Sequence, residues 1–152
     1  MSEKKKLHVS AIKNGTVIDH IPANQLFTVL RVLGLDHINK PITFGTNMES
    51  KKLGSKGLIK IWDIYLEEED LKRIALITED AVINVIENYQ VREKKKISTP
   101  EKIEGLAKCV NPKCITNHEK MNTRFTVLNT EELALRCDYC EKITEKKNFK
   151  II

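Results

Sequence analysis

The segments C-V-N-P-K-C at residues 109–114 and C-D-Y-C at residues 137–140 contain all four cysteines of the 152-residue chain. Their spacing is C-x4-C, then 22 residues, then C-x2-C. Two close cysteine pairs separated by a segment of hairpin length are typical of one tetrahedral zinc ion bound by four thiolates. We therefore predict one structural Zn²⁺ per chain. Its predicted ligands are Cys109, Cys114, Cys137 and Cys140.

The segment around the cysteines is too short to bury a large core by itself. Metal binding supplies roughly 10–16 kcal/mol of apparent free energy in small zinc peptides, which is enough to hold such a module together. Residues 123–128 and 133–136 are predicted to pair as strands, with a turn near Asn129. We therefore expect residues 98–152 to form a small all-β domain of the zinc-ribbon or rubredoxin-like type.

A structural role for the zinc ion is favoured over a catalytic one, because a catalytic zinc keeps an open position and has typically three protein ligands. Four cysteines fill the tetrahedron, and His118 is therefore expected to be a surface loop residue. A redox role for the C-x2-C pair, or iron in place of zinc, remains as an alternative.

The chain upstream of the cysteines alternates between strand-like and helix-like segments. Residues 7–13 and 16–20 are predicted strands joined by Asn14-Gly15, the strongest two-residue hairpin signal. Pro22 suits the first turn of a helix that Gly34 ends. The apolar face of this helix is predicted from the spacing of Leu26, Phe27, Leu30 and Leu33.

Further elements follow up to residue 97. Residues 42–47 are a predicted strand, whose exposed edge is a candidate dimer contact. A polar loop through Gly54, Lys56 and Gly57 is predicted next, followed by a strand at residues 58–64. Four acids at residues 67–70 suit the first turn of a second helix. Residues 81–86 and 89–95 are predicted to pair through a tight Glu87-Asn88 turn. Without one flanking strand, this order is that of a ferredoxin-like sandwich, with two helices on one face of an antiparallel sheet. The predicted class is α+β, with one domain at residues 1–97 and the second at 98–152.

Composition is typical of a soluble globular protein, with 41% apolar and 31% charged residues and a formal charge of +5. No apolar run reaches the length of a membrane span, and no apolar signal-peptide core follows the charged first six residues. We expect a cytoplasmic protein, because thiols stay reduced there and are available to a metal.

Several motifs together are distinctive. They are G-T-V-I-D-H-I-P at residues 15–22, I-K-I at 59–61, N-x-I-x-N-Y-x-V at 84–91, C-x-N-P-x-C-I at 109–115 and R-C-x-Y-C-E at 136–141. In these motifs the chain resembles the regulatory chain of aspartate carbamoyltransferase over nearly its whole length.

The resemblance implies an allosteric subunit in de novo pyrimidine biosynthesis and not an enzyme. It implies an N-terminal domain that binds CTP, ATP and UTP, and a zinc domain that docks on the catalytic chain. It also implies a regulatory-chain homodimer, three of which join two catalytic trimers. The family's nucleotide contacts fall on Ala11, Ile12, Val17, Asp19, His20, Lys60, Asn84, Ile86, Tyr89, Val91 and Lys94. The expected catalytic-chain interface includes Asn111, Lys113 and Glu141.

The chemistry of these residues suits a nucleoside triphosphate. Lys60 and Lys94, with Lys56 and His20, can bind phosphates. Asp19 can accept hydrogen bonds from ribose hydroxyls, and Asn84 can donate to phosphate or ribose. Backbone groups near Ala11, Ile12, Tyr89 and Val91 can read the base edge. The sequence has no G-x4-G-K-[ST] motif, so the site is not a P-loop.

Each residue also has a purely structural interpretation. Asp19-His20 could cap the following helix, the lysines could be ordinary exposed strand residues, and Tyr89 could belong to the core. One rival function is a zinc-ribbon protein that binds nucleic acid, which the positive charge allows but the 5% aromatic content and the acids of the ribbon disfavour. The other rival is an enzyme that uses the zinc or an Asp19–His20 pair, which strand alternation disfavours because neighbours point to opposite faces.

Overall fold

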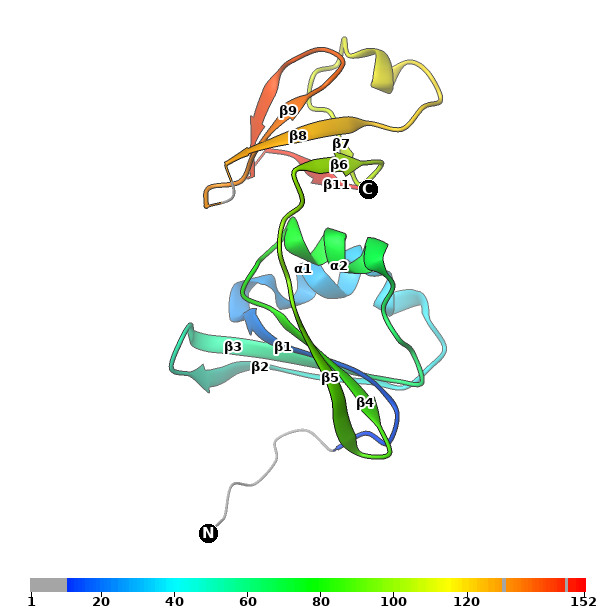
Figure 1. Ribbon diagram of the computed structural model, residues 1–152, viewed down its shortest axis with the longest axis vertical. Coiled ribbons are helices and arrows are strands. Elements are labelled where there is room, and N and C mark those ends of the chain that lie inside the picture. The colour runs from blue at the N-terminus through cyan, green and yellow to red at the C-terminus, as the bar shows by residue number, and fades with distance from the viewer. Residues whose placement is uncertain (1–10, 130, 147) are drawn as a thin grey trace.

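The structure is a computed structural model that describes residues 11–129, 131–146 and 148–152. Figure 1 shows two β-structures with the helices α1 (Leu26–Val32) and α2 (Glu68–Ala75) between them. The larger sheet is formed by the N-terminal part of the chain, and the smaller sheets by the C-terminal part. The predicted α+β class is confirmed.

The larger sheet has five antiparallel strands in the order β2-β3-β1-β4-β5. Their bounds are β1 Gly15–Pro22, β2 Ile42–Ser50, β3 Gly54–Trp62, β4 Val82–Glu87 and β5 Gln90–Lys96. The first four strands with the two helices have the ferredoxin-like order, and β5 extends one edge. The ferredoxin-like prediction is therefore confirmed, with β2 and β5 as edge strands.

One face of this sheet is covered by the helices and holds the core. Ile18, Ile59, Ile61 and Ile83 from the central strands pack with Leu26 and Val29 of α1 and with Ile74 of α2, and all are buried. Because side chains alternate along a strand, the residues between these isoleucines face the opposite, helix-free side. The same alternation separates the core from the candidate site.

The second helix begins as the sequence predicts, whereas Pro22, predicted in the first turn of the first helix, is the last residue of β1, and α1 begins at Leu26. One face assignment is also wrong. A 3₁₀ turn at Ala23–Gln25 precedes α1, another follows it at Leu35–His37, and the backbone N–H of Glu67 donates to Asp70 Oδ2 at 3.0 Å at the start of α2. Phe27 was predicted on the apolar face but is exposed, and its ring lies edge-to-face with Phe44, 5.7 Å away. Leu26 and Val29 occupy the core in its place.

The predicted hairpin at Asn14-Gly15 is wrong. Residues 7–10 lie outside the described residues, and Ala11–Asn14 is not a strand. The strand β1 is paired with β3 on one side and β4 on the other, which leaves no edge for a preceding partner. Gly15 lets β1 lie close to β3, since a Cβ at this position would lie 2.0 Å from the carbonyl oxygen of Ile61.

The predicted polar loop through Gly54, Lys56 and Gly57 is also wrong, because these residues open β3. They pair with β2, where Lys56 faces Met48 and Gly54 faces Ser50. A Cβ on Gly57 would lie 2.9 Å from Leu26 Cδ1, so this glycine lets α1 pack directly on the sheet.

The C-terminal part contains a four-stranded sheet in the order β10-β9-β8-β6 and a two-stranded sheet of β11 and β7. Their bounds are β6 Lys102–Glu104, β7 Ala107–Lys108, β8 Arg124–Asn129, β9 Ala134–Cys137, β10 Ile143–Glu145 and β11 Lys150–Ile151. A 3₁₀ turn spans Ile115–Asn117. The predicted pairing of residues 123–128 with 133–136 is confirmed by β8 and β9. A second core gathers around Phe125 and Leu135.

The two cores meet through the end of α2 and the end of the chain. Leu76 packs in the second core, and Ile151 packs against both. The ammonium of Lys146 donates to the carbonyl oxygen of Ile77, and the N–H of Ile152 donates to the carbonyl of Leu106 at 2.9 Å. Helix α2 is therefore in contact with the C-terminal part. None of the helices in the described part has the length and apolar character to cross a membrane.

Candidate functional site

Four predicted nucleotide-binding residues form one row across the helix-free face of the larger sheet. Val17 on β1 is the register partner of Lys60 on β3 and of Asn84 on β4, and Asn84 is the partner of Lys94 on β5. Directly opposed residues of antiparallel strands project to the same face. The register thus brings together side chains that lie up to 77 residues apart in the sequence.

More of the predicted residues share this face. Asp19 lies two positions beyond Val17 on β1, and Ile86 lies two beyond Asn84 on β4. Ile86 is paired with Val91 of β5 across a register shift at Val85/Ile86. Period-two alternation gives Asp19 and Ile86 the orientation of the row, and the pairing with Ile86 gives it to Val91. The helix-free face therefore combines an apolar part with a carboxylate and lysines.

A bulge in β1 builds the polar corner of this face. The register of β1 with β3 shifts between Ile18 and Ile21, and His20 has a left-handed φ of 58°. Asp19 Oδ1 accepts from the His20 backbone N–H at 2.7 Å and from the Lys56 ammonium at 2.8 Å. His20 Nε2 lies 3.9 Å from Asp19 Oδ2. The expectation that Asp19 and His20 point to opposite faces is wrong, because the bulge interrupts the alternation.

A turn at the far end of the face fixes the segment before β1. Asn88 and Tyr89 both have positive φ, 51° and 66°, as in a two-residue hairpin turn. The Tyr89 N–H donates to the Lys13 carbonyl at 2.9 Å, and the Asn88 N–H donates to Asn14 Oδ1 at 3.1 Å. These bonds hold the Ala11–Asn14 segment beside Tyr89. Ile12 is buried, whereas Ala11 and Tyr89 are exposed.

Two residues of the row have unusual electrostatic settings. Burial lowers the pKa of the Lys60 ammonium, and the nearby Asp19 carboxylate opposes this shift. Asn84 is buried, and its Oδ1 has no hydrogen-bond partner among the described residues; the same holds for His20 Nδ1. A partly desolvated cation beside unpartnered polar atoms is suited to an anionic ligand that carries hydroxyl groups.

The four cysteines converge in the C-terminal part. Their sulfur atoms all lie within 4.8 Å of one another. Cys109 Sγ is 3.6 Å from Cys140 Sγ, and Cys114 Sγ is 3.7 Å from Cys137 Sγ. Three of the cysteines are buried and Cys140 is partly exposed. This arrangement fits one tetrahedrally coordinated metal ion. His118 stays outside the cluster, with Nε2 2.8 Å from the Pro112 carbonyl oxygen.

The loops that carry the cysteines are fixed by local hydrogen bonds. The Asn117 side-chain amide donates to the carbonyls of Cys109 and Asn111, at 3.0 and 2.8 Å. Burial raises the pKa of the Cys109 thiol to about 12. Burial acts in the same direction on Cys140, but hydrogen bonds from the Asn111 side chain and the Lys142 backbone outweigh it and lower the pKa of that thiol to about 7. A cation among the sulfurs would stabilise all four as thiolates.

The residues predicted to contact a catalytic chain lie on these cysteine loops. Lys113 and Glu141 are exposed, and the Lys113 N–H donates to Asn111 Oδ1 at 3.0 Å. Glu141 has a left-handed φ of 65° and donates its N–H to the Cys137 carbonyl at 2.9 Å. All three residues therefore have positions set by the cysteine cluster.

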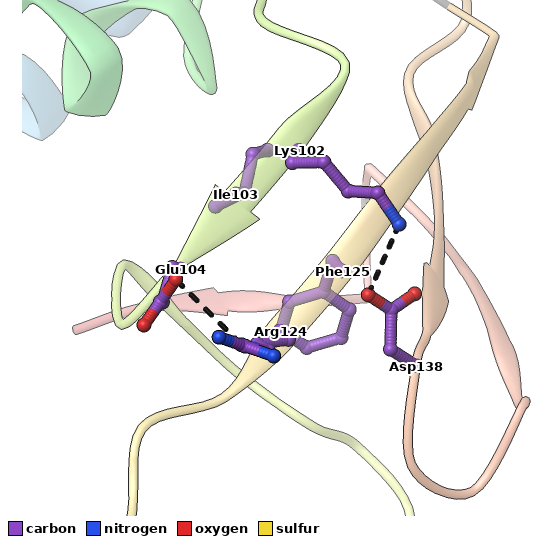
Figure 2. A pocket seen from close by; sticks show the side chains of 6 residues that line it. All are labelled: Lys102, Ile103, Glu104, Arg124, Phe125 and Asp138. Atoms are coloured by element: carbon purple, nitrogen blue, oxygen red, sulfur yellow. Dashed lines mark hydrogen bonds and ion pairs between the residues drawn. The ribbon is translucent and has the colours of Figure 1, made fainter.

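The adjacent sheet has a hollow of about 280 Å³, which Figure 2 shows with the side chains that line it. Lys102 Nζ lies 3.3 Å from Asp138 Oδ2, and Arg124 Nε lies 3.6 Å from Glu104 Oε2. A hydrogen bond from Thr126 is the main cause that lowers the pKa of the Asp138 carboxyl. The sequence reasoning missed this hollow because it did not predict β6, whose three residues carry no strong strand signal.

Comparison with known proteins agrees with the geometry. Residues 7–98 match the family model described as the aspartate carbamoyltransferase regulatory chain, allosteric domain, and residues 101–150 match that of its metal binding domain. The chain belongs to this family. It is thus a regulatory chain, which is a non-catalytic subunit.

Relatives named aspartate carbamoyltransferase regulatory chain match over nearly their whole length. The chain is 48% identical to that of Phocaeicola vulgatus over 100% of this chain and 99% of the relative. It is 52% identical to that of Porphyromonas gingivalis over 92% and 93%, and 46% identical to that of Pyrococcus horikoshii over 93% and 95%. The resemblance stated from the motifs is therefore confirmed for a regulatory chain with allosteric and metal-binding domains.

Proposed function

We propose that this chain senses nucleoside triphosphates for an aspartate carbamoyltransferase and transmits their binding to the catalytic chain without performing chemistry. CTP, ATP and UTP are the proposed effectors. The observation that carries the proposal is the row of Val17, Lys60, Asn84 and Lys94 across four adjacent strands. A sheet face with lysines on one row suits a nucleotide laid across the strands.

The roles follow from the chemistry of each group. Lys60 and Lys94 bind the phosphates, with His20 and Lys56 at the corner of the face. Asp19 Oδ1 already accepts two hydrogen bonds, so Oδ2 is the oxygen available to a ribose hydroxyl. Asn84 Oδ1 gains a donor from the ligand. Val17, Ile86 and Val91 contact the base and sugar, and backbone groups near Ala11, Ile12 and Tyr89 bind the base edge.

The metal that we propose for the cysteine cluster is one Zn²⁺ per chain, held by Cys109, Cys114, Cys137 and Cys140. The set of four sulfur donors favours zinc over hard cations such as Mg²⁺. When bound, the ion cross-links the two cysteine loops and positions Asn111, Lys113 and Glu141 for the catalytic chain. The paired charges of the nearby hollow suit a protein surface better than a small ion, because both signs are present.

The proposed assembly divides the chain into a nucleotide domain, residues 1–97, and a docking domain, residues 98–152. It includes a homodimer of the regulatory chain in the cytoplasm, where the four thiols stay reduced. Effectors act by binding two states of the holoenzyme with different affinities. Their signal passes from the sheet through α2, since Leu76 of this segment packs in the core of the docking domain.

Calorimetric titration of the full chain with CTP tests the proposed site. Lys94→Ala removes a phosphate contact and is expected to weaken binding by about tenfold or more, as for a charge-assisted hydrogen bond. Lys95→Ala is the matched control, because Lys95 pairs with Ile83 of the core-facing set and lies on the opposite face of the same strand. Equal affinities of the two variants for CTP would contradict the site.

A further inference from the structure

A groove of about 550 Å³ lies on the other side of the helices, away from the proposed nucleotide face. Its wall is formed by α1, by Leu76 and Ile77 at the end of α2, and by the last residues of the chain. Figure 1 shows the helices between the larger sheet and the C-terminal part. The residues that line the groove come from α1, from the end of α2 and from the C-terminal segment. Its volume is in the range of small-molecule sites, about 300–1,000 Å³.

The charged residues that line the groove are all cations, namely Arg31, Lys146 and Lys150. Within the described part of the chain, none of the ion pairs includes Arg31 or Lys150. The ammonium of Lys146 is held by the Ile77 carbonyl at the end of α2. Three positive charges around one hollow, with no acidic side chain among the described residues that line it, create a local field that favours an anion.

The rest of the lining is largely apolar. Val32 lies on the α1 side, Leu76 and Ile77 at the end of α2, and Phe149 and Ile151 on the side of the C-terminal segment. Leu76 is fully buried, and Phe149 is partly buried against the second core. Gln25 and Thr28 add two uncharged polar side chains. The groove thus offers an apolar wall and a cationic rim to one ligand.

We propose that this groove binds a small organic anion with an aromatic or apolar body and a carboxylate or phosphate head. The head is bound by Arg31 and Lys150, and the body packs against the partly exposed Val32 and Phe149. Arginine binds such heads through two parallel hydrogen bonds, and aromatic rings pack well against apolar surface. Sequence patterns do not indicate this site, because Arg31 is separated from Lys146 and Lys150 by more than 100 residues.

Occupation of the groove has a mechanical consequence. Arg31 belongs to α1, whereas Lys150 belongs to β11 in the C-terminal part. A ligand that touches both ties the nucleotide domain to the docking domain and favours one relative position of the two. This inference goes beyond the proposed nucleotide site and does not depend on it.

The test uses the zinc-loaded full chain and the aromatic sulfonate probe 8-anilino-1-naphthalenesulfonate. We expect fluorescence enhancement, and a tenfold or greater loss of probe affinity in Arg31→Gln/Lys150→Gln, since two charged contacts are removed. The matched control is Lys120→Gln/Arg136→Gln, which removes two exposed cations elsewhere. Equal affinity of the groove variant and the wild type would overturn the proposal, as would an equal loss in the control.

Two further readouts locate the site and identify the head group. Amide NMR shifts induced by the probe are expected at Gln25, Thr28 and Phe149, and shifts confined to β1 and β4 would contradict the groove. Benzoate and phenyl phosphate are then added as competitors. Displacement by one of them identifies the preferred head, and failure of both to displace the probe would overturn the proposed ligand class. CTP calorimetry reports separately on the nucleotide site.

Discussion

The ammonium of Lys56 lies 2.8 Å from Asp19 Oδ1, and both side chains are largely shielded from solvent. The pair links β3 to the bulge of β1, and it leaves the second oxygen of Asp19 facing the imidazole of His20. Lys56 is therefore a residue that positions Asp19 as well as a candidate phosphate ligand. Because of this double role, loss of either charge of the pair should affect both the stability of this corner and its binding of phosphate.

Asp19→Asn is expected to lower the free energy of unfolding by about 1–2 kcal/mol, because it leaves the partly buried ammonium of Lys56 without its carboxylate. It should also weaken CTP binding. Urea unfolding and CTP calorimetry measure the two effects. Asp36→Asn is the control, since Asp36 has a single 3.5 Å contact with the exposed His37. A stability loss in the Asp36 variant as large as that in the Asp19 variant would refute this interpretation of the ion pair.

Asn84→Ala is expected to separate binding from stability. Removal of a buried oxygen without a partner offsets the small cavity, so the free energy of unfolding should change by less than about 1 kcal/mol, whereas CTP affinity should fall about tenfold. Asn117→Ala provides the contrast. Its amide holds the carbonyls of Cys109 and Asn111, so its loss should destabilise the cysteine loops and leave CTP binding unchanged. An unchanged CTP affinity in the Asn84 variant would contradict the proposed contact between Asn84 and the nucleotide.

Lys60 gives the binding a pH dependence of defined sign. Burial lowers its pKa in the free chain, and a bound triphosphate raises it again by favouring the charged form. At alkaline pH, between the two pKa values, binding must take up a proton, and CTP affinity should fall as the pH rises. Calorimetry in two buffers with different ionisation enthalpies measures this uptake. Lys60→Met should abolish this proton uptake. Lys94 of the same row and Asp19 are unchanged in this variant. Uptake that persists in Lys60→Met would assign the proton to another group.

Metal removal is expected to affect only the C-terminal part. A chelator, or Cys137→Ser, should reduce bound zinc from about one ion per chain to nearly none and remove the dispersed NMR signals of residues 103–151. CTP binding should survive, because the larger sheet has its own core. Thr116→Ala, which removes a hydroxyl 3.2 Å from Cys114 Sγ, serves as a milder control that keeps the metal. A fully folded C-terminal part without any metal would contradict the role of the cluster.

The sequence predicted those elements whose signal is local. Acids at the start of α2, the strand-like residues 81–86 and the spacing of the cysteines all report on nearby residues, and each prediction holds. The row of Val17, Lys60, Asn84 and Lys94 was identified through the family motifs. Its members come from four strands, so only the register of the sheet could show why they belong together.

The errors have a common physical cause, which is long-range packing. Gly15 and Gly57 predict a turn and a loop, but both are needed for close packing in the sheet: Gly15 lies against the Ile61 carbonyl and Gly57 against Leu26 of α1. Phe27 has the spacing of a core residue, but Phe44 of β2 offers it an exposed edge-to-face partner. The groove beside α1 could not be predicted either, since the C-terminal segment that closes it follows the cysteine cluster.

The most direct test of the central claim is the aspartate saturation curve of a purified catalytic trimer, measured alone and with the zinc-loaded chain, each with and without CTP. The account predicts that the chain assembles with the trimer and that CTP then shifts the aspartate concentration at half-maximal rate, while CTP has no such effect on the trimer alone. It also predicts that Lys94→Ala removes the shift and Lys95→Ala preserves it. Identical curves with and without CTP, in an assembled complex, would contradict the account.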